Sequence, residues 1–144
     1  MATETANKKY KYNDEFYGKK LSEIVDIVHK YYSKKMNWKE NTLYPGTFGY
    51  DNMAMSIGYA LSETKDLEIK KLASKIHDGW IINYVYWRDN QPWLTNDFYK
   101  KPYSPLGDQR RNECANLPYD KLNKEEQEKD DCIAECLINL FSQK

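Results

Sequence analysis

The sequence feature that most constrains the fold is an apolar stripe within residues 66–88. Its members recur at steps of three and four positions, the spacing that places side chains on one face of an α-helix. A helix of this length with one apolar face must bury that face against other elements. We therefore predict a long amphipathic helix in a helical domain. The stripe consists of Ile69, Leu72, Ala73, Ile76, Trp80, Ile81, Tyr84 and Trp87.

Two further helices are predicted before this long helix. Residues 20–36 repeat apolar side chains at helical spacing and predict a first helix with one buried face. Residues 41–49 contain turn-forming proline and glycine, so we expect a loop there. A shorter second helix is predicted to end at Leu61, with Asp51 or Asn52 capping its first turn.

The region after the long helix divides into an irregular segment and a last helix. Residues 89–118 have no sustained period, and their prolines predict an irregular loop or a short β-hairpin. Asn123, with Glu126 three positions later, matches the capping-box start of a helix. Four predicted helices and little predicted strand indicate a mainly α fold class. The apolar face of the last helix consists of Ile133, Cys136, Leu137, Leu140 and Phe141.

Size and charge limit the class of protein. The 144 residues suffice for one core, since domains commonly run to roughly 100–150 residues. We expect residues 1–15 to be a flexible N-terminal segment and residues 16–144 to form a single domain. Lys plus Arg equals Asp plus Glu, at 22 each. No overall field therefore favours long nucleic acid or an anionic membrane as a partner.

The apolar runs and the cysteines indicate a cytoplasmic location. No apolar run approaches the ~18–20 residues that span a bilayer, and the first residues lack the apolar region of a secretory signal. Cys114, Cys132 and Cys136 form an odd set without the spacing of a disulfide scaffold. We expect reduced thiols and no membrane partner.

Aromatic residues are frequent, with 13 tyrosines and 4 tryptophans. Such side chains suit both protein cores and the walls of ligand pockets. Trp93 follows Pro92 in the irregular segment, where its indole could stack on a planar ligand or cover the core. Trp80 and Trp87 share the apolar stripe, so core packing and ligand stacking both stay open for them.

Charged residues suggest how a phosphorylated ligand would be held. Arg88, Arg110 and Arg111 are the only arginines in the chain. Their planar guanidinium groups can grip phosphates with paired hydrogen bonds, although a solvated surface position is the alternative. His77 lies on the shoulder of the stripe, where a structural hydrogen bond and a ligand contact are both open.

No residue pattern favours catalysis. The two histidines are far apart, and no metal-binding or triad spacing is present. We therefore expect a protein that binds rather than transforms its ligand, without a metal or cofactor.

Two sequence motifs occur in order along the chain. Residues 76–80, on the predicted long helix, read Ile-His-Asp-Gly-Trp, and residues 117–122 read Leu-Pro-Tyr-Asp-Lys-Leu and lead into an acidic, lysine-rich helix start. Both motifs resemble those of the ryanodine-receptor (RyR) repeat family, and the resemblance covers residues 72–141. It implies a compact, mainly α domain with a short β-hairpin or irregular loop between the third and last helices.

The resemblance also implies a function. RyR repeats are not known for catalysis, and their aromatic cleft accepts adenine nucleotides or planar heterocycles. The resemblance implies a sensor or sequestering sponge for a nucleotide-derived signal, ADP-ribose-like or cyclic, in phage and bacterial immunity. Tyr119 and Asp120 of the motif would brace the turn, and Asp120 could also accept from the ligand. The alternative is a protein-interaction module, and homo-oligomerisation stays open.

Overall fold

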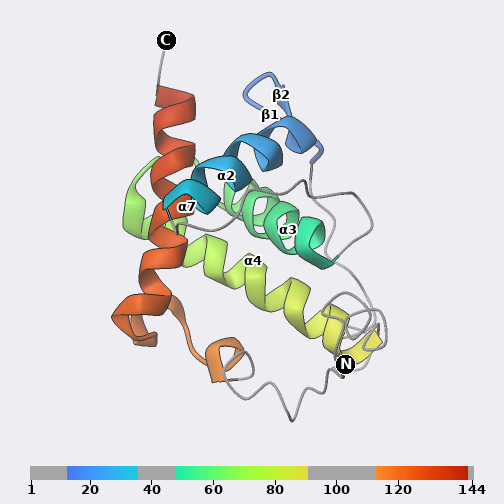
Figure 1. Ribbon diagram of the computed structural model, residues 1–144, viewed down its shortest axis with the longest axis vertical. Helices are drawn as coiled ribbons and strands as arrows, with labels where there is room; N and C mark the ends of the chain where they lie inside the picture. The colour runs from blue at the N-terminus through green and yellow to red at the C-terminus, as the bar shows by residue number, and fades with distance from the viewer. Residues whose placement is uncertain (1–12, 36–47, 91–112, 143–144) are drawn as a thin grey trace.

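The computed structural model describes residues 13–35, 48–90 and 113–142, and shows a mainly helical fold (Figure 1). The predicted fold class is therefore confirmed. In chain order the elements are β1 (Glu15–Phe16), β2 (Lys19–Lys20), α2 (Leu21–Lys35), α3 (Phe48–Glu63), α4 (Ile69–Asn90), the 3-10 helix η1 (Tyr119–Lys121) and α7 (Lys124–Ser142). Within these ranges, no helix combines the length and apolarity that crossing a bilayer requires.

Helix α4 is the long helix that the sequence stripe predicts, and it packs on two other long helices. It makes its most extensive contact with α3 and its second with α7 (Figure 1). Gly79 explains the close fit with α3, since a Cβ there would lie 2.7 Å from the backbone oxygen of Met55 and 2.9 Å from Cα of Ser56. Only glycine lets the two backbones approach this closely.

The main core collects fully buried aliphatic side chains from all four long helices. Burying such a side chain contributes about 1.5–3 kcal/mol. Helix α2 closes the core by packing on both α3 and α7. Its Tyr31 hydroxyl donates to the carboxylate of Glu135 on α7, although the two residues are 104 positions apart in the chain. Buried members include Ile24, Val25, Val28, Ala54, Ile57, Leu72, Ala73, Ile76, Ala134 and Leu137.

The helix boundaries test the capping predictions. Asn123 caps α7 as predicted, because its Oδ1 accepts from the backbone N–H of Glu126 at 2.9 Å. The predicted start of α3 is wrong: the helix already begins at Phe48, so Asp51 and Asn52 lie inside it. Asp51 still lies in the first turn, where a carboxylate is favourable beside the positive end of the helix dipole.

A two-stranded antiparallel hairpin precedes α2, where no strand is predicted. Glu15 pairs with Lys20 and Phe16 with Lys19. Tyr17 and Gly18 form the turn with φ values of 52° and 81°, the left-handed geometry that two-residue hairpin turns prefer. The Tyr17 ring packs on Phe141 of α7, with 4.6 Å between ring centroids. Of residues 89–118, predicted to be an irregular loop or a short hairpin, the first two belong to α4 and residues 91–112 lie outside the described residues.

Candidate functional site

Three aromatic rings stack along one side of α4. We call His77, Trp80 and Tyr84 the ring ladder. The centroids of His77 and Trp80 are 5.8 Å apart with 11° between the ring planes. Those of Trp80 and Tyr84 are 5.3 Å apart with 1° between the planes. Their spacing of three and four residues brings them together on a helix, and each aromatic pair adds about 0.5–1.5 kcal/mol.

The ring ladder limits what Trp80 can do. Its indole is only partly buried, and it lies nearly parallel to the rings of both His77 and Tyr84. A planar ligand that stacks on Trp80 would have to share the indole with these two neighbours. Tyr84 is fully buried and forms a small cluster with Trp80, Tyr86 and Ala115, separate from the main core.

His77 ties the ring ladder to the turn before η1. Its ring is buried, with 3% of its surface exposed, and Nε2 lies 2.7 Å from the carbonyl oxygen of Leu117. Because a carbonyl oxygen can only accept, Nε2 carries the proton and donates it. On the other side of the ring, Nδ1 faces Oδ2 of Asp130 on α7 at 3.7 Å. His77 therefore joins α4, the Leu117 turn and α7.

Asp130 occupies an environment that disfavours its charge. Burial raises the pKa of its carboxyl well above the ordinary value, and the neighbouring carboxylates of Asp131 and Glu126 raise it further. The positive charge of Lys129 lowers the pKa of Asp130, but by less than these effects raise it. The 3.7 Å approach to His77 is too long for a hydrogen bond, so we expect burial to dominate.

Tyr119 belongs to a different network, at the start of α4. Its hydroxyl donates to the carboxylate of Asp131 and accepts from Nζ of Lys70 at 2.9 Å. Lys70 also donates to Asp131 at 3.1 Å. Burial raises the pKa of Tyr119, and the hydrogen bond to Asp131 raises it further. The phenol is therefore held protonated as a link between η1, α4 and α7, while Asp120 beside it is exposed.

The remaining predicted site residues are located only in part. Trp87 and Arg88 lie in the last turns of α4, but their side chains are outside the described part of the structure. Trp93, Arg110 and Arg111 fall in residues 91–112, which also lie outside it. Of the predicted set, the structure brings His77 and Trp80 together and links them to the motif through Leu117. Tyr119 points instead toward Lys70, two helical turns before His77.

One polar residue near the ring ladder is absent from the predicted site. Asn83 is fully buried on α4, and neither its Oδ1 nor its Nδ2 has a hydrogen-bond partner among the described residues. Asn52 Oδ1 on α3 is also buried without a partner there. Each unsatisfied group of this kind costs about 1–3 kcal/mol. The sequence does contain a sign of this buried position. Asn83 follows Ile76 by seven positions, about two helical turns, so the two residues share the buried face of the helix.

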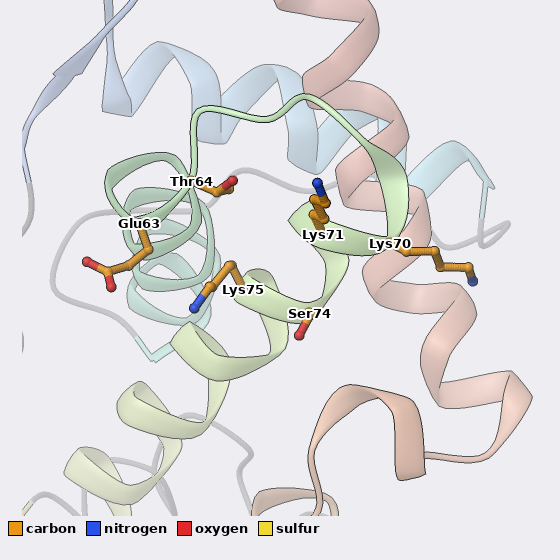
Figure 2. Close-up of a pocket in the computed structure, with 6 residues that line it drawn as sticks. All are labelled: Glu63, Thr64, Lys70, Lys71, Ser74 and Lys75. Atoms are coloured by element: carbon orange, nitrogen blue, oxygen red, sulfur yellow. The ribbon is translucent and has the colours of Figure 1, made fainter.

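Figure 2 shows a pocket of about 360 Å³ at the corner between α3 and α4. Its ammonium groups do not converge: the side chains of Lys70 and Lys75 point in opposite directions (Figure 2). Lys70 is bonded to Tyr119 and Asp131, and Lys71 pairs with Asp66 at 3.1 Å. These contacts make the pocket a poor cradle for a phosphate. The lining residues are Glu63, Thr64, Lys70, Lys71, Ser74 and Lys75.

Comparisons of the chain with protein-family models, with curated proteins and with solved structures give no match. Among the described residues, no group of three or more His, Cys, Asp or Glu side chains is arranged to hold a metal ion. The features of the chain that point to a function are therefore its two sequence motifs and the geometry of α4.

Proposed function

We propose that this chain is a non-enzymatic, cytoplasmic binding domain of RyR-repeat type. Its ligand is a nucleotide-derived small molecule, ADP-ribose-like or a cyclic nucleotide, taken up at the second half of α4 as a sensed or sequestered signal. The observation that carries this proposal is the ring ladder, since stacked rings fixed between helices form a rigid wall beside which a planar ligand can bind.

The position of the ring ladder supports this location for the ligand. Tyr84 ends the ladder, and the next turn of α4 carries Trp87 and Arg88. Because Trp80 already packs against His77 and Tyr84, Trp87 replaces it in our proposal as the stacking residue of the helix. Arg88, one position further, supplies a guanidinium for a phosphate. Trp93 and the arginines of residues 91–112 complete the proposed site.

The state of the ionisable groups supports binding over catalysis. His77 uses Nε2 for the Leu117 carbonyl, so this nitrogen is committed to the fold. Burial raises the pKa of the Cys132 thiol, and it raises that of Cys136 to about 11. A thiol is a nucleophile only as thiolate, so these cysteines are poor candidates for covalent chemistry.

Isothermal titration of the full chain with ADP-ribose and with cyclic dinucleotides tests the proposal. We expect one of them to bind, with a loss of about tenfold or more in Trp87→Ala, because a stacking contact contributes about 1–3 kcal/mol. Arg88→Lys should also weaken binding, since lysine cannot form the paired phosphate contact. Tyr17→Ala, which removes an exposed aromatic side chain on the N-terminal hairpin, serves as the control and should bind normally. A well-folded protein that binds none of these compounds would refute the proposal.

The protein-interaction alternative has weaker support. The large exposed apolar side chains of the described residues are Tyr17, Ile27, Ile69 and Leu117. They come from the hairpin, α2, the start of α4 and the turn before η1. Single exposed apolar residues of this kind are normal on monomeric proteins, whereas a partner surface requires a contiguous patch. We therefore do not propose a second function.

A further inference from the structure

Residues 113–118, which we call the ladder cover, pack on the ring ladder. The carbonyl oxygen of Leu117 accepts a hydrogen bond from Nε2 of His77 at 2.7 Å. Ala115 packs against Tyr84 in the small aromatic cluster. The ladder cover therefore contacts the ring ladder at both of its ends.

A third contact joins the ladder cover to α7. The Cys114 thiol donates a weak hydrogen bond to Oε2 of Glu126 at 3.7 Å. Glu126 lies one helical turn before Asp130, so the two side chains share a face of α7. Oδ2 of Asp130 in turn lies 3.7 Å from Nδ1 of His77. The carboxyl of Asp130 is therefore a neighbour of both side chains that hold the ladder cover by hydrogen bonds.

The surroundings of Asp130 favour its protonated form. Only 13% of its side chain is exposed. Lys129 favours the negative charge, but it is paired with Glu126 at 3.1 Å. An ionised Asp130 would therefore add a charge to an acidic region that little water reaches. The carboxyl groups that disfavour its charge are Asp131 and Glu126 on α7 and Asp78 on α4.

His77 offers no hydrogen-bond donor to an ionised Asp130. In the neutral ring the proton lies on Nε2, where it is donated to Leu117, so Nδ1 presents a lone pair. The carboxylate would face this lone pair across 3.7 Å. Its charge can be satisfied by water that enters between α4 and α7, at the place where the ladder cover is held.

We propose that the ladder cover is a pH-sensitive latch, closed while Asp130 is protonated and open when Asp130 is ionised. As the pH rises, the proton passes to solvent, and the water that solvates the carboxylate displaces the contacts of Cys114 and Leu117. Opening uncovers the side of the ring ladder that residues 113–118 protect. The closed form binds one proton more than the open form, so it is favoured at low pH and lost at high pH. This inference requires no ligand and does not rest on the proposed function.

The adjoining helix η1 provides an internal reference. Nε2 of Gln127 donates to the carbonyl oxygens of Tyr119 and Leu122, at 3.1 Å in each case. These bonds hold η1 on α7 without the ladder cover. We therefore expect η1 to stay in place when the latch opens.

Hydrogen exchange of backbone amides, measured by NMR on the full chain from about pH 5 to 8, tests the latch. The amide of Leu117 donates to the carbonyl oxygen of Cys114 at 3.3 Å in the closed form. Its protection factor, which corrects for the intrinsic effect of pH on exchange, should fall by up to about tenfold per pH unit, the slope of one linked proton. The amide of Leu122, which donates to Tyr119 at 3.1 Å, should keep its protection.

Asp130→Asn should abolish the pH dependence at Leu117, because asparagine has a similar shape and cannot ionise. Glu128→Gln removes an exposed carboxylate of the same helix and is the matched control. Its exchange should follow that of the unmodified chain. Should Asp130→Asn fail to fold, the carbon-13 shift of the Asp130 carboxyl in the unmodified chain decides the outcome. Its titration midpoint should coincide with the loss of protection at Leu117.

Three results would overturn the inference. The first is a protection factor at Leu117 that does not change with pH or changes equally in Asp130→Asn. The second is a carboxyl of Asp130 that titrates at a different pH from the loss of protection. The third is lower protection in Asp130→Asn than in the unmodified chain at every pH, which would mean that an ionised Asp130 holds the ladder cover through a protonated His77.

Discussion

The two halves of α4 differ in what surrounds them. In the first half, Leu72, Ala73 and Ile76 are fully buried in the main core shared with α2, α3 and α7. In the second half, Tyr84 forms a separate small cluster and Asn83 buries an amide without a partner in the described structure. One continuous helix thus joins a region packed mainly by aliphatic side chains to one that holds a buried amide without a partner among the described residues.

This difference indicates that the two halves of α4 have different roles. Close packing of aliphatic side chains gives the first half its stability. Buried polar groups without partners lower stability, and proteins retain them mainly where a ligand or mechanism needs them. We therefore assign stability to the first half of α4, and we propose that its second half recognises the ligand.

Ile76→Ala should have the largest effect on stability, because Ile76 is fully buried in the main core. The cavity should lower the free energy of unfolding by about 2–5 kcal/mol, measured by urea denaturation. The same substitution at Ile82, a partly exposed residue of the second half, should lower it by less than half as much. Equal losses of unfolding free energy at the two positions would contradict the assignment of stability to the first half of α4.

Gly79→Ala tests the boundary between the two halves. The added methyl would meet backbone atoms of Met55 and Ser56, which cannot rotate away as a side chain could. We expect a loss of about 1–3 kcal/mol in the free energy of unfolding, despite the roughly 1 kcal/mol that alanine gains over glycine in a helix. Ser74→Ala, at a half-buried position of the same helix, is the control and should change little. A stabilised Gly79→Ala variant would show that α3 and α4 can separate freely.

Asp130→Asn should give the smallest effect, and one that depends on pH. Burial raises the pKa of Asp130, so the folded protein holds this proton more tightly than the unfolded chain. The contribution of this carboxyl to stability is therefore lost as the pH rises from the unfolded pKa of about 3.9 toward the raised folded value. Asparagine cannot ionise, so the variant should gain stability relative to the unmodified protein between about pH 4 and 7.

Urea denaturation at several pH values in this range measures that difference. Asp26→Asn, which alters an exposed carboxylate paired with Lys30, controls for general effects of charge removal. The opposite result would be a variant that becomes less stable, relative to the unmodified protein, as the pH rises. It would mean that His77 stabilises an ionised Asp130, against the expectation from burial.

Sequence periodicity predicted the framework well because burial of one helix face is a local pattern. The helices around residues 20–36 and 66–88 were found at α2 and α4, and the Asn123 cap was confirmed. The start of α3 was missed because a capping residue is also acceptable inside the first turn. The N-terminal hairpin was missed because its strands are two residues long, too short for an alternating pattern.

The candidate site was less predictable because it depends on contacts between distant segments. Spacing alone placed His77 near Trp80, but it could not predict the near-parallel packing of Trp80 on Tyr84 or the hydrogen bond from His77 to Leu117. Asn83 was overlooked because a polar residue at a buried spacing has no function until its partners are known. Trp93, Arg110 and Arg111 stay predictions, since they lie outside the described residues.

The contact between Tyr31 and Glu135 has a consequence for synthesis of the protein. The two residues are 104 positions apart, so the apolar face of α2 acquires its α7 neighbour only late in translation. Contacts between such distant residues slow folding, because a long stretch of chain must be ordered before they form. During that interval the nascent α2 exposes Ile24, Val25 and Val28, and we expect it to be the segment that a ribosome-associated chaperone binds first.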